Sequence, residues 1–407
     1  MVSAIAPMLL SRSEQSFIVI DPKDGEAMSI SARFRGTNGP VGVLTPERLP
    51  EDFAAEGMAG IYLSLNPLDV LVPGDRNLVL SAKRLADALI MRSDVKRDQF
   101  WDEMAHRWMT ATFIHIATWR SEVERTLMRV QEVVAAGWPD EVLFAMLNNG
   151  EGQGIIQRAA QEIEANQEAA GEGSRLYQDI RAALLNAFQF LDSPGVRASF
   201  AVSNFNPKML RTHDRPLTVY LVTEARHMDV YGRWLRLIYT ALIDMIAGVA
   251  GREVAVIVDE FAALKRFDRV VQDLATLRGA GFRIHLAVQD LSQLQDLYGH
   301  GWQSIVGNCG VRQFLGVNDV FTADYVERLL GQTTAEKPYA HHVKPWGGEG
   351  PGFWKSELVG RPLMSAAEIT NMDQQRQIIV LDGMPKPLLT YKAEYFNYEP
   401  WRSRAMA

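Results

Sequence analysis

Short apolar runs recur along the chain, separated by stretches whose apolar residues return every three or four positions. Such runs are typical of strands buried in a parallel sheet, and the intervening spacing is typical of helices that cover it. The alternation predicts an α/β fold with a mostly parallel sheet and helices on both faces. The runs that we expect to form strands are residues 17–21, 41–44, 60–65, 216–223, 254–258, 283–288, 312–317 and 377–382.

The stretch between the third and the fourth run has almost no strand pattern. Helical spacing predicts helices at 78–91, 99–118, 119–136, 139–148, 155–170 and 173–191. We therefore predict an all-α domain over residues 75–200, inserted between residues 1–74 and 201–407 of an α/β domain. Its aromatic residues, Trp108 and Phe113 among them, are expected to pack a helical core and not to stack on bases. The Gly- and Pro-rich residues 333–360 predict an irregular loop.

Two adjacent carboxylates, Asp259 and Glu260, end the apolar run Val254–Val258. The carboxyl end of a parallel strand is where open α/β sheets bind ligands. The first carboxylate can hold Mg²⁺, directly or through water, and the second can orient or deprotonate an attacking water. A strand that merely ends in a solvated acidic pair has the same local pattern, so the residues downstream have to decide.

Arg278 and Gln289 are the downstream residues that favour a nucleotide site. A predicted helix closes on Arg278 and Gly279-Ala-Gly281, and the next apolar run ends at Gln289. In motor ATPases a glutamine at such a strand end senses the γ-phosphate, and an arginine at such a corner can reach a neighbour's nucleotide. The alternatives are an amide bonded to backbone for Gln289 and a helix-terminal cation for Arg278. We expect the Arg278 corner to lie at the edge of the nucleotide crevice, facing outward.

A lysine follows the first predicted strand, in the sequence Asp21-Pro-Lys23. The end of that strand lies next to the expected phosphate site, where Lys23 could contact phosphate. A purely structural turn explains the same three residues equally well.

Composition narrows the class of protein further. The 407 residues are 47% hydrophobic and 22% charged, which indicates globular domains and argues against disorder. The single cysteine, Cys309, excludes an internal disulfide. No apolar stretch approaches the roughly twenty residues of a membrane-spanning helix. The net charge of −7 argues against a broadly basic nucleic-acid surface, so any contact with DNA has to be local or lie in a pore of several subunits.

These motifs resemble a known family, the TraG/TraD-type coupling ATPases of type IV secretion and conjugation. The most specific similarity lies in Asp259-Glu-Phe-Ala-Ala-Leu264, Leu277-Arg-Gly-Ala-Gly-Phe-Arg283 and Ala287-Val-Gln-Asp-Leu-Ser-Gln-Leu294. It continues, more weakly, in residues 17–26, 65–69, 304–312, 318–331, 360–364 and 377–385, so that it covers nearly the whole chain.

The resemblance implies a RecA-like P-loop NTPase sheet with an inserted all-α domain. It implies that Asp259 holds Mg²⁺ and that Glu260 activates water. It also implies that Gln289 binds the nucleotide by sensing its γ-phosphate, and that Arg278 acts on the nucleotide of a neighbouring subunit. Lys23 is the further candidate for contact with phosphate.

The family's phosphate-binding Walker A loop has no counterpart in this chain. Members carry it just before the helix that here begins at Val2, and no Gly-Lys dipeptide occurs anywhere in the sequence. A phosphate cradle needs consecutive backbone N–H groups and usually a lysine. We therefore expect a sheet without its first strand and P-loop, truncated before Val2, and weak or no binding of Mg-ATP by this chain alone.

By the same resemblance, the full-length protein is a homo-hexamer at the cytoplasmic face of the inner membrane. Its partners would be DNA with its relaxase, or effector proteins, and components of the secretion channel. Two other interpretations stay open. One is a non-catalytic interaction module or gene remnant, and the other is an FtsK- or HerA-like DNA translocase, which shares the sheet.

Overall fold

The protein forms two compact units in a computed structural model that describes residues 1–11, 14–47, 61–91, 99–119, 121, 124–171, 175–341 and 353–406. One unit comprises Met1–Val288 with Glu394–Ala407, and the other comprises Gln289–Ala393. The domain division into residues 1–74, 75–200 and 201–407 stays a prediction.

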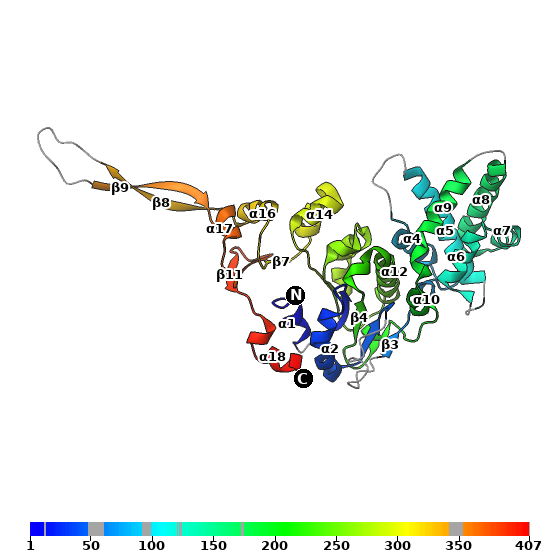
Figure 1. Cartoon of the computed structure of the whole chain (residues 1–407), viewed down its shortest axis with the longest axis horizontal. Helices are drawn as coiled ribbons and strands as arrows, with labels where there is room; N and C mark the ends of the chain where they lie inside the picture. Colours follow the sequence, from blue (N-terminus) through cyan, green and yellow to red (C-terminus); the bar gives the residue numbers. More distant parts are fainter. Residues whose placement is uncertain are drawn as a thin grey trace, which may run out of the picture. The chain divides into compact units, whose positions relative to one another are not determined.

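A six-stranded, all-parallel sheet forms the centre of the first unit (Figure 1). Every residue of β1, β4 and β5 is buried, which explains why apolar residues predominate in their sequences. The six apolar runs from residue 17 to residue 288 are therefore confirmed as parallel strands. In spatial order they are β3 (Ile61–Leu63), β2 (Val41–Leu44), β4 (Thr218–Val222), β1 (Ser16–Asp21), β5 (Val254–Val258) and β6 (Phe282–Leu286).

Helices cover both faces of this sheet. The short helix α1 (Ile5–Leu9) and the helix α2 (Glu26–Asn38) lie on one side, and α12 (Met228–Ile246) lies on the other (Figure 1). Alternate strand positions, such as Val19 and Ile257, form a core with residues of α1 and α2. Removal of this apolar surface from water is the main favourable term in the folding of the unit. The helix α13 (Asp268–Thr276) connects β5 to β6.

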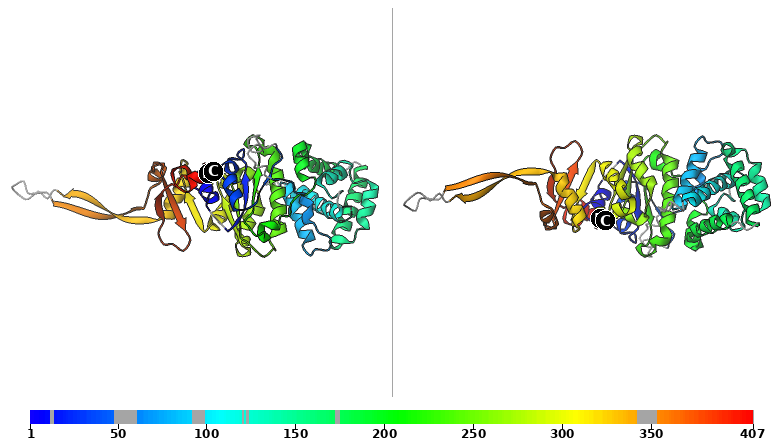
Figure 2. Two further views of the ribbon diagram at one scale, coloured as in Figure 1. Left: turned by 90° about the horizontal axis from the view of Figure 1, so that it is seen from below. Right: turned by 90° about the horizontal axis from the view of Figure 1, so that it is seen from above.

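All elements that the structure describes between residues 67 and 212 are helical. Figure 2 shows from two further sides that most of them gather into one group. Within the first unit α4 packs against α12, whereas the last of them, Met209–Thr212, packs against β1. They are the 3₁₀ turns Pro67–Val70, Glu151–Gly154 and Gln189–Asp192 and the helices α4 (Leu78–Leu89), α5 (Gln99–Trp119), α6 (Leu127–Ala135), α7 (Asp140–Leu147), α8 (Ile155–Gly171), α9 (Leu176–Ala187), α10 (Pro194–Phe200) and α11 (Met209–Thr212).

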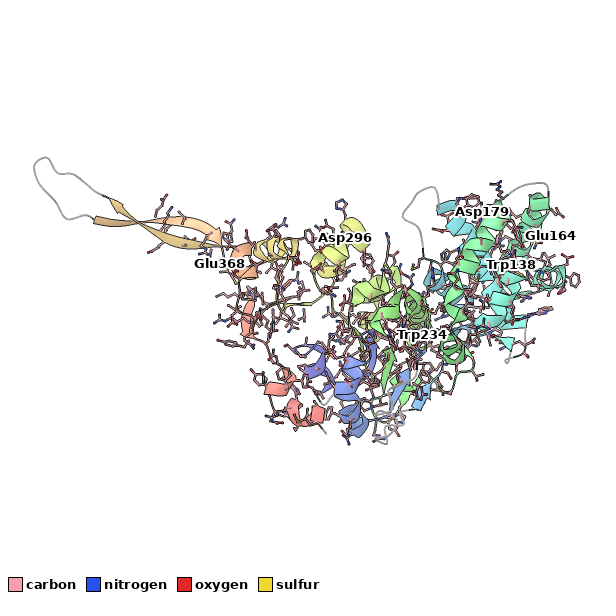
Figure 3. All side chains as sticks on the ribbon, in the orientation of Figure 1. Trp138, Glu164, Asp179, Trp234, Asp296 and Glu368 are labelled. Carbon is pink, nitrogen blue, oxygen red and sulfur yellow. The ribbon has the colours of Figure 1, made fainter. Side chains whose placement is uncertain are left out.

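The core of the helical region is aromatic, as the sequence predicts in part. The indole Nε1 of Trp138 donates to Thr112 Oγ1 at 2.9 Å, and its ring meets Trp108 edge-on at 5.7 Å (Figure 3). Trp108 and Phe113 are fully buried. Two other aromatic residues of α5 do not belong to this core, because Phe100 is 55% exposed and Trp119 is 47% exposed.

The C-terminal helix α18 (Trp401–Met406) belongs to the first unit, where it packs on α2. Arg404 Nη1 donates to the carbonyl of Leu10 at 2.7 Å, and the guanidinium lies 4.7 Å from the centre of the Phe34 ring. Trp401 Nε1 donates to Ser11 Oγ at 3.0 Å. These contacts hold the end of the chain against its beginning.

The second unit corrects two predictions. The runs at 312–317 and 377–382 are strands, but they do not extend the parallel sheet. They form β7 (Val311–Phe314) and β10 (Arg376–Leu381), which pair antiparallel in a separate sheet with β11 (Leu388–Tyr391). The second error concerns residues 333–360, because β8 (Gln332–His341) and β9 (Phe353–Pro362) form a long antiparallel ribbon there (Figure 2). Residues 342–352 of the predicted loop lie outside the described part of the chain.

Four α-helices complete the described part of the second unit. Its small core joins Val317, Ala323, Val326, Ile369 and Ile378. The helices are α14 (Leu291–Tyr298), α15 (Trp302–Gly307), α16 (Val320–Leu330) and α17 (Ala366–Thr370). No helix in the described ranges of either unit is both long and apolar enough to cross a membrane.

Candidate active site

Asp259 and Glu260 lie directly beyond the carboxyl end of β5, in the turn that follows the strand. The Asp259 N–H donates to the Ile20 carbonyl of β1 at 3.1 Å, so the pairing of the two strands continues to this residue. The Phe261 N–H donates to Ala287 at 2.8 Å, which ties the turn to the end of β6. Both neighbours of β5 therefore fix the position of the acidic pair.

Glu260 has an unusual backbone conformation, with φ 67° and ψ 64°. Residues other than glycine rarely adopt this left-handed region, and such conformations cluster at functional sites. The turn buries Phe261 completely and leaves the Glu260 side chain 13% exposed. This backbone conformation thus allows the Phe261 ring to be buried while the neighbouring Glu260 carboxylate stays in contact with solvent.

Asp21 and Lys23 come from the neighbouring strand β1 and meet the acidic pair. Lys23 Nζ lies 3.6 Å from Asp259 Oδ1 and 3.4 Å from Glu260 Oε2. Asp21 is completely buried, and its Oδ2 accepts from the N–H of Met28 in α2 at 3.0 Å. The structure therefore brings Lys23, Asp259 and Glu260 together, as the sequence predicts, and adds Asp21.

The neighbouring charges act on Asp21 and Lys23. Burial, and then the Asp259 carboxylate, raise the pKa of Asp21 to about 7. Burial acts to lower the pKa of Lys23, but the Asp259 and Glu260 carboxylates outweigh it and raise that pKa. Lys23 therefore stays a cation and balances part of the negative charge at this end of the sheet.

Arg278 lies at the opposite edge of the sheet. It is an exposed residue of the turn Leu277–Ala280 that leads into β6, so it belongs to the amino edge of the parallel strands. There the Val254 N–H donates to Gly281 at 3.0 Å, and Arg283 pairs with Glu253 at 2.6 Å. With five residues in β5, Arg278 is separated from Asp259 by roughly 16 Å of strand. The expected position beside the crevice formed by its own chain is therefore wrong.

Gln289 follows the end of β6 and is the first residue of the second unit. The strand ends at Leu286, a little earlier than the apolar run suggests. Gln289 is exposed and precedes Asp290, whose side chain caps α14 by accepting from the Gln293 N–H at 3.0 Å. Its role toward a γ-phosphate stays a prediction.

The residues at the carboxyl edge fit a magnesium ion. Asp259 is 2% exposed, and its Oδ2 has no hydrogen-bond partner among the described residues. A buried carboxylate oxygen without a partner is costly unless a cation or water satisfies it. No cluster of three or more metal-binding side chains occurs in the ranges that the structure describes. Mg²⁺ often binds through one or two carboxylates, with waters and phosphate oxygens as the remaining ligands.

Asp21 is the site residue to which the sequence assigned no role. Its signal was present, because an acidic residue ends the otherwise apolar stretch Phe17–Ile20. What the sequence did not reveal is that β1 and β5 are neighbours in the sheet. Only that pairing places Asp21 next to Asp259.

The chain is similar in sequence and in fold to known proteins. The profile of the family described as "Type IV secretory system Conjugative DNA transfer" matches residues 1–406. The chain belongs to this family. The resemblance to the TraG/TraD-type family of type IV secretion and conjugation is thereby confirmed.

Two kinds of relative illustrate the similarity. Conjugal transfer protein TraG of Escherichia coli is 26% identical over 360 residues, which cover 83% of this chain and 54% of TraG. Protein VirD4 of Agrobacterium fabrum is 23% identical over 420 residues, covering 97% of this chain and 57% of VirD4. The chain thus spans about half the length of these relatives.

Solved structures confirm the α/β RecA-like fold. The unbound coupling protein TrwBdeltaN70 superposes with a TM-score of 0.68 at 14% identity, over 93% of this chain and 78% of TrwB. TrwB in complex with ADP and Mg²⁺ gives a TM-score of 0.63 at 13% identity, over 97% of this chain and 93% of TrwB. TrwB has also been solved in complex with a non-hydrolysable ATP analogue, so that protein binds nucleotide.

Proposed function

We propose that the protein is the motor part of a conjugative coupling protein that uses ATP to pass DNA–protein substrates into a type IV secretion channel. The observation that carries this proposal is the cluster of Lys23, Asp259 and Glu260 at the carboxyl edge of a RecA-like sheet, in a member of this family. That edge is where open parallel sheets bind their ligands.

Each side chain of the cluster has a separate task in the proposed site. Asp259 offers its buried, unpartnered Oδ2 as a ligand for Mg²⁺. The ion, when bound with ATP, would neutralise charge on the phosphates. Glu260 accepts the proton of the attacking water or orients that water, because its carboxylate stays partly exposed. Lys23 holds both carboxylates and can turn to a phosphate oxygen.

Two groups outside the cluster complete the proposal. Gln289 contacts the γ-phosphate through its amide, from the segment that follows β6. Arg278, at the amino edge, cannot reach the cluster of its own chain across the length of β5. It therefore acts on the nucleotide of a neighbouring subunit, which requires an assembly such as a homo-hexamer.

The partners and the location follow from the proposed function. The substrates are DNA with its bound relaxase, or effector proteins, and the receiving partner is the secretion channel. The assembly works on the cytoplasmic side of the inner membrane. The helical region between β3 and β4 is the part that we propose to contact the substrate, because it projects from the sheet as a separate group of helices.

ATP binding by this chain is expected to be weak or absent. The cluster supplies metal and water contacts, but the chain has no Gly-Lys loop to hold the phosphates. Titration calorimetry with Mg-ATP measures this directly. The matched comparison is a longer version of the protein with a family Walker A segment ahead of residue 1, which should bind in the micromolar range and hydrolyse ATP.

Either of two results would contradict this proposal. Low-micromolar binding by the chain alone would show that the phosphate loop is dispensable. A longer version that binds ATP but never hydrolyses it, with or without DNA, would favour the alternative of a non-catalytic interaction module.

A further inference from the structure

Two buried carboxylates stand side by side on one face of the sheet. Ile20 of β1 is the register partner of Val258 of β5, and the next residues along the two strands are Asp21 and Asp259. Residues in register on neighbouring strands point to the same face, with Cα atoms roughly 5 Å apart. The preceding alternate positions, Val19 and Ile257, both face α1 and α2. Asp21 and Asp259 therefore point toward that same side.

Each of the two carboxylates has one oxygen without a hydrogen-bond partner among the described residues. The unpartnered atoms are Asp21 Oδ1 and Asp259 Oδ2, and the side chains are 0% and 2% exposed. The other oxygens are occupied, since Asp21 Oδ2 accepts from the Met28 N–H at 3.0 Å and Asp259 Oδ1 lies 3.6 Å from Lys23 Nζ. The backbone N–H groups of Ala27 and Lys23 also favour the charged form of Asp21. A buried acceptor is rarely left unsatisfied in a native protein.

The balance of charge at the pair also calls for a cation. Asp21, Asp259 and Glu260 carry three carboxylates, and Lys23 is the ammonium that the structure places against two of them. Two adjacent buried carboxylates repel each other unless a cation or a proton lies between them. A divalent cation bound to both free oxygens would remove that conflict.

We propose that Asp21 and Asp259 together bind a divalent cation, with Asp21 as a second protein ligand that fixes the ion on the α1–α2 face of the sheet. This inference rests on the magnesium part of the proposed function and adds a ligand from a different strand. Two hard carboxylate oxygens favour Mg²⁺ or Mn²⁺, and the remaining ligands would be water or phosphate oxygens.

Binding of Mn²⁺ to the whole chain without nucleotide tests the proposal, by the loss of the free-ion electron paramagnetic resonance signal at pH 8. Asp21→Asn keeps the size of the side chain and an oxygen for the Met28 N–H, but it removes the charge. We expect it to weaken Mn²⁺ binding at least tenfold, and Asp259→Asn to do the same. The matched control is Asp24→Asn, an exposed residue of the same turn, which should bind within twofold of wild type.

A cysteine at the same position gives a second, independent readout. A thiolate prefers soft ions, so Asp21→Cys should lose Mn²⁺ and gain Cd²⁺ binding at least tenfold over wild type. Wild type, whose single cysteine is the half-buried Cys309, measures the background. This variant decides the question even where Asp21→Asn fails to fold, which melting curves recorded without metal would reveal.

The outcomes separate this inference from the function on which it rests. If Asp259→Asn weakens Mn²⁺ binding while Asp21→Asn stays within twofold of wild type, Asp21 is not a ligand and only the inference falls. If neither variant changes Mn²⁺ binding, both the inference about Asp21 and the proposed magnesium site at Asp259 are wrong. If Asp21→Cys gains no Cd²⁺ affinity, Asp21 does not face the ion.

Discussion

Glu260 illustrates how one residue can serve a site at the expense of local stability. Left-handed backbone at a residue other than glycine costs on the order of 1 kcal/mol or more. The burial of Phe261 and its hydrogen bond to Ala287 offset that cost. In return the Glu260 carboxylate turns away from the core and toward Lys23.

Glu260→Gln should separate nucleotide binding from hydrolysis in the longer, loop-bearing protein. The amide keeps the shape but cannot accept the water's proton, and loss of a general base typically costs roughly 10²–10⁴ in rate. We expect ATP affinity to stay within about twofold and steady-state turnover to fall at least tenfold. A coupled ATPase assay together with calorimetry measures both.

The matched control for this substitution is Glu253→Gln. Glu253 lies just before the amino end of β5 and pairs with Arg283, so it shares the strand but not the site. Its turnover should stay within twofold of wild type. Turnover of Glu260→Gln at the level of this control would rule out the proposed role of Glu260.

At the scale of elements, buried charges join three helices around the sheet. Arg269 of α13 donates to Asp244 of α12 at 2.7 Å and to both oxygens of Asp273 at 2.9 and 2.8 Å. The Tyr239 hydroxyl donates to Asp273 at 2.9 Å. Arg84 of α4 reaches the same Asp244 at 2.9 Å. This network fixes α13, which follows the acidic turn, to α4, the first helix of the helical region.

A second arginine joins the same elements through backbone groups. Arg236 of α12 donates to the carbonyls of Asp87 and Ala88 at the end of α4, at 3.0 and 3.1 Å. It also donates to the Arg266 carbonyl, ahead of α13, at 2.7 Å. A movement of the turn that holds Asp259 and Glu260 would therefore be transmitted to α4 through two sets of contacts.

Arg269→Met should destabilise the first unit strongly. The substitution keeps much of the side-chain volume but leaves Asp244 and Asp273 buried with less positive charge, and breaking a buried ion pair typically costs about 3–5 kcal/mol. Arg266→Met, three residues earlier, removes an ion pair with Asp268 in which both side chains are about half exposed. Such exposed pairs are worth about 0–1 kcal/mol.

Urea denaturation, followed by tryptophan fluorescence, compares the two variants. The buried indoles of Trp138 and Trp234 report on this unit (Figure 3). Equal midpoints for Arg269→Met and Arg266→Met would show that the buried network contributes little to stability.

At the scale of the whole molecule, the two edges of the sheet carry complementary halves of the proposed site. The carboxyl edge has the cluster around Asp259, and the amino edge has Arg278. Although Arg278 is separated from the cluster of its own chain by the length of a strand, it can still contribute to the cluster of a neighbouring subunit. The separation is therefore a reason to expect that hydrolysis depends on assembly.

Mixing experiments test this dependence in the longer protein. Arg278→Ala and Glu260→Gln subunits should each be nearly inactive alone, since a finger arginine is worth roughly 10³–10⁵ in rate where it is known. Mixed assemblies should recover part of the activity, because some interfaces then combine an intact Glu260 with an intact Arg278. Light scattering must first show that the variants assemble.

The control for mixing is Arg278→Ala with the double variant Glu260→Gln/Arg278→Ala. No interface in that mixture has an intact Arg278, so no activity should return. If the first mixture is as inactive as the control, Arg278 does not act between subunits and is better explained as a cation at a helix end.

The sequence by itself determined the parallel sheet, the helical region and the acidic pair. Strands such as β1 and β5 are buried on both faces, so β5 is apolar throughout and β1 is apolar over Phe17–Ile20, and both can be recognised without knowing their neighbours. The helices are amphipathic, so their apolar residues recur every three or four positions and can be recognised in the sequence. Asp259 and Glu260 stand out because charge interrupts an apolar run at a position where the topology predicts a site.

Only the tertiary structure decided how exposed strands pair. β7 alternates between exposed and half-buried residues, and its local pattern does not say whether its partner runs parallel or antiparallel. In the ribbon of β8 and β9 the residues whose exposure is described are mostly exposed, so no apolar pattern marks the strands. Backbone hydrogen bonds between strands create these elements, and such bonds leave little trace in side-chain periodicity.

The same limit applies to the site. Lys23, Asp259 and Glu260 could be predicted because each follows its own strand, but the pairing of Asp21 with Asp259 depends on which strands are neighbours. The position of Arg278 depends on the path of α13, which returns the chain to the amino edge of the sheet before β6 begins. Local sequence fixes what a residue can do chemically, and the order of strands in the sheet decides which residues it can act with.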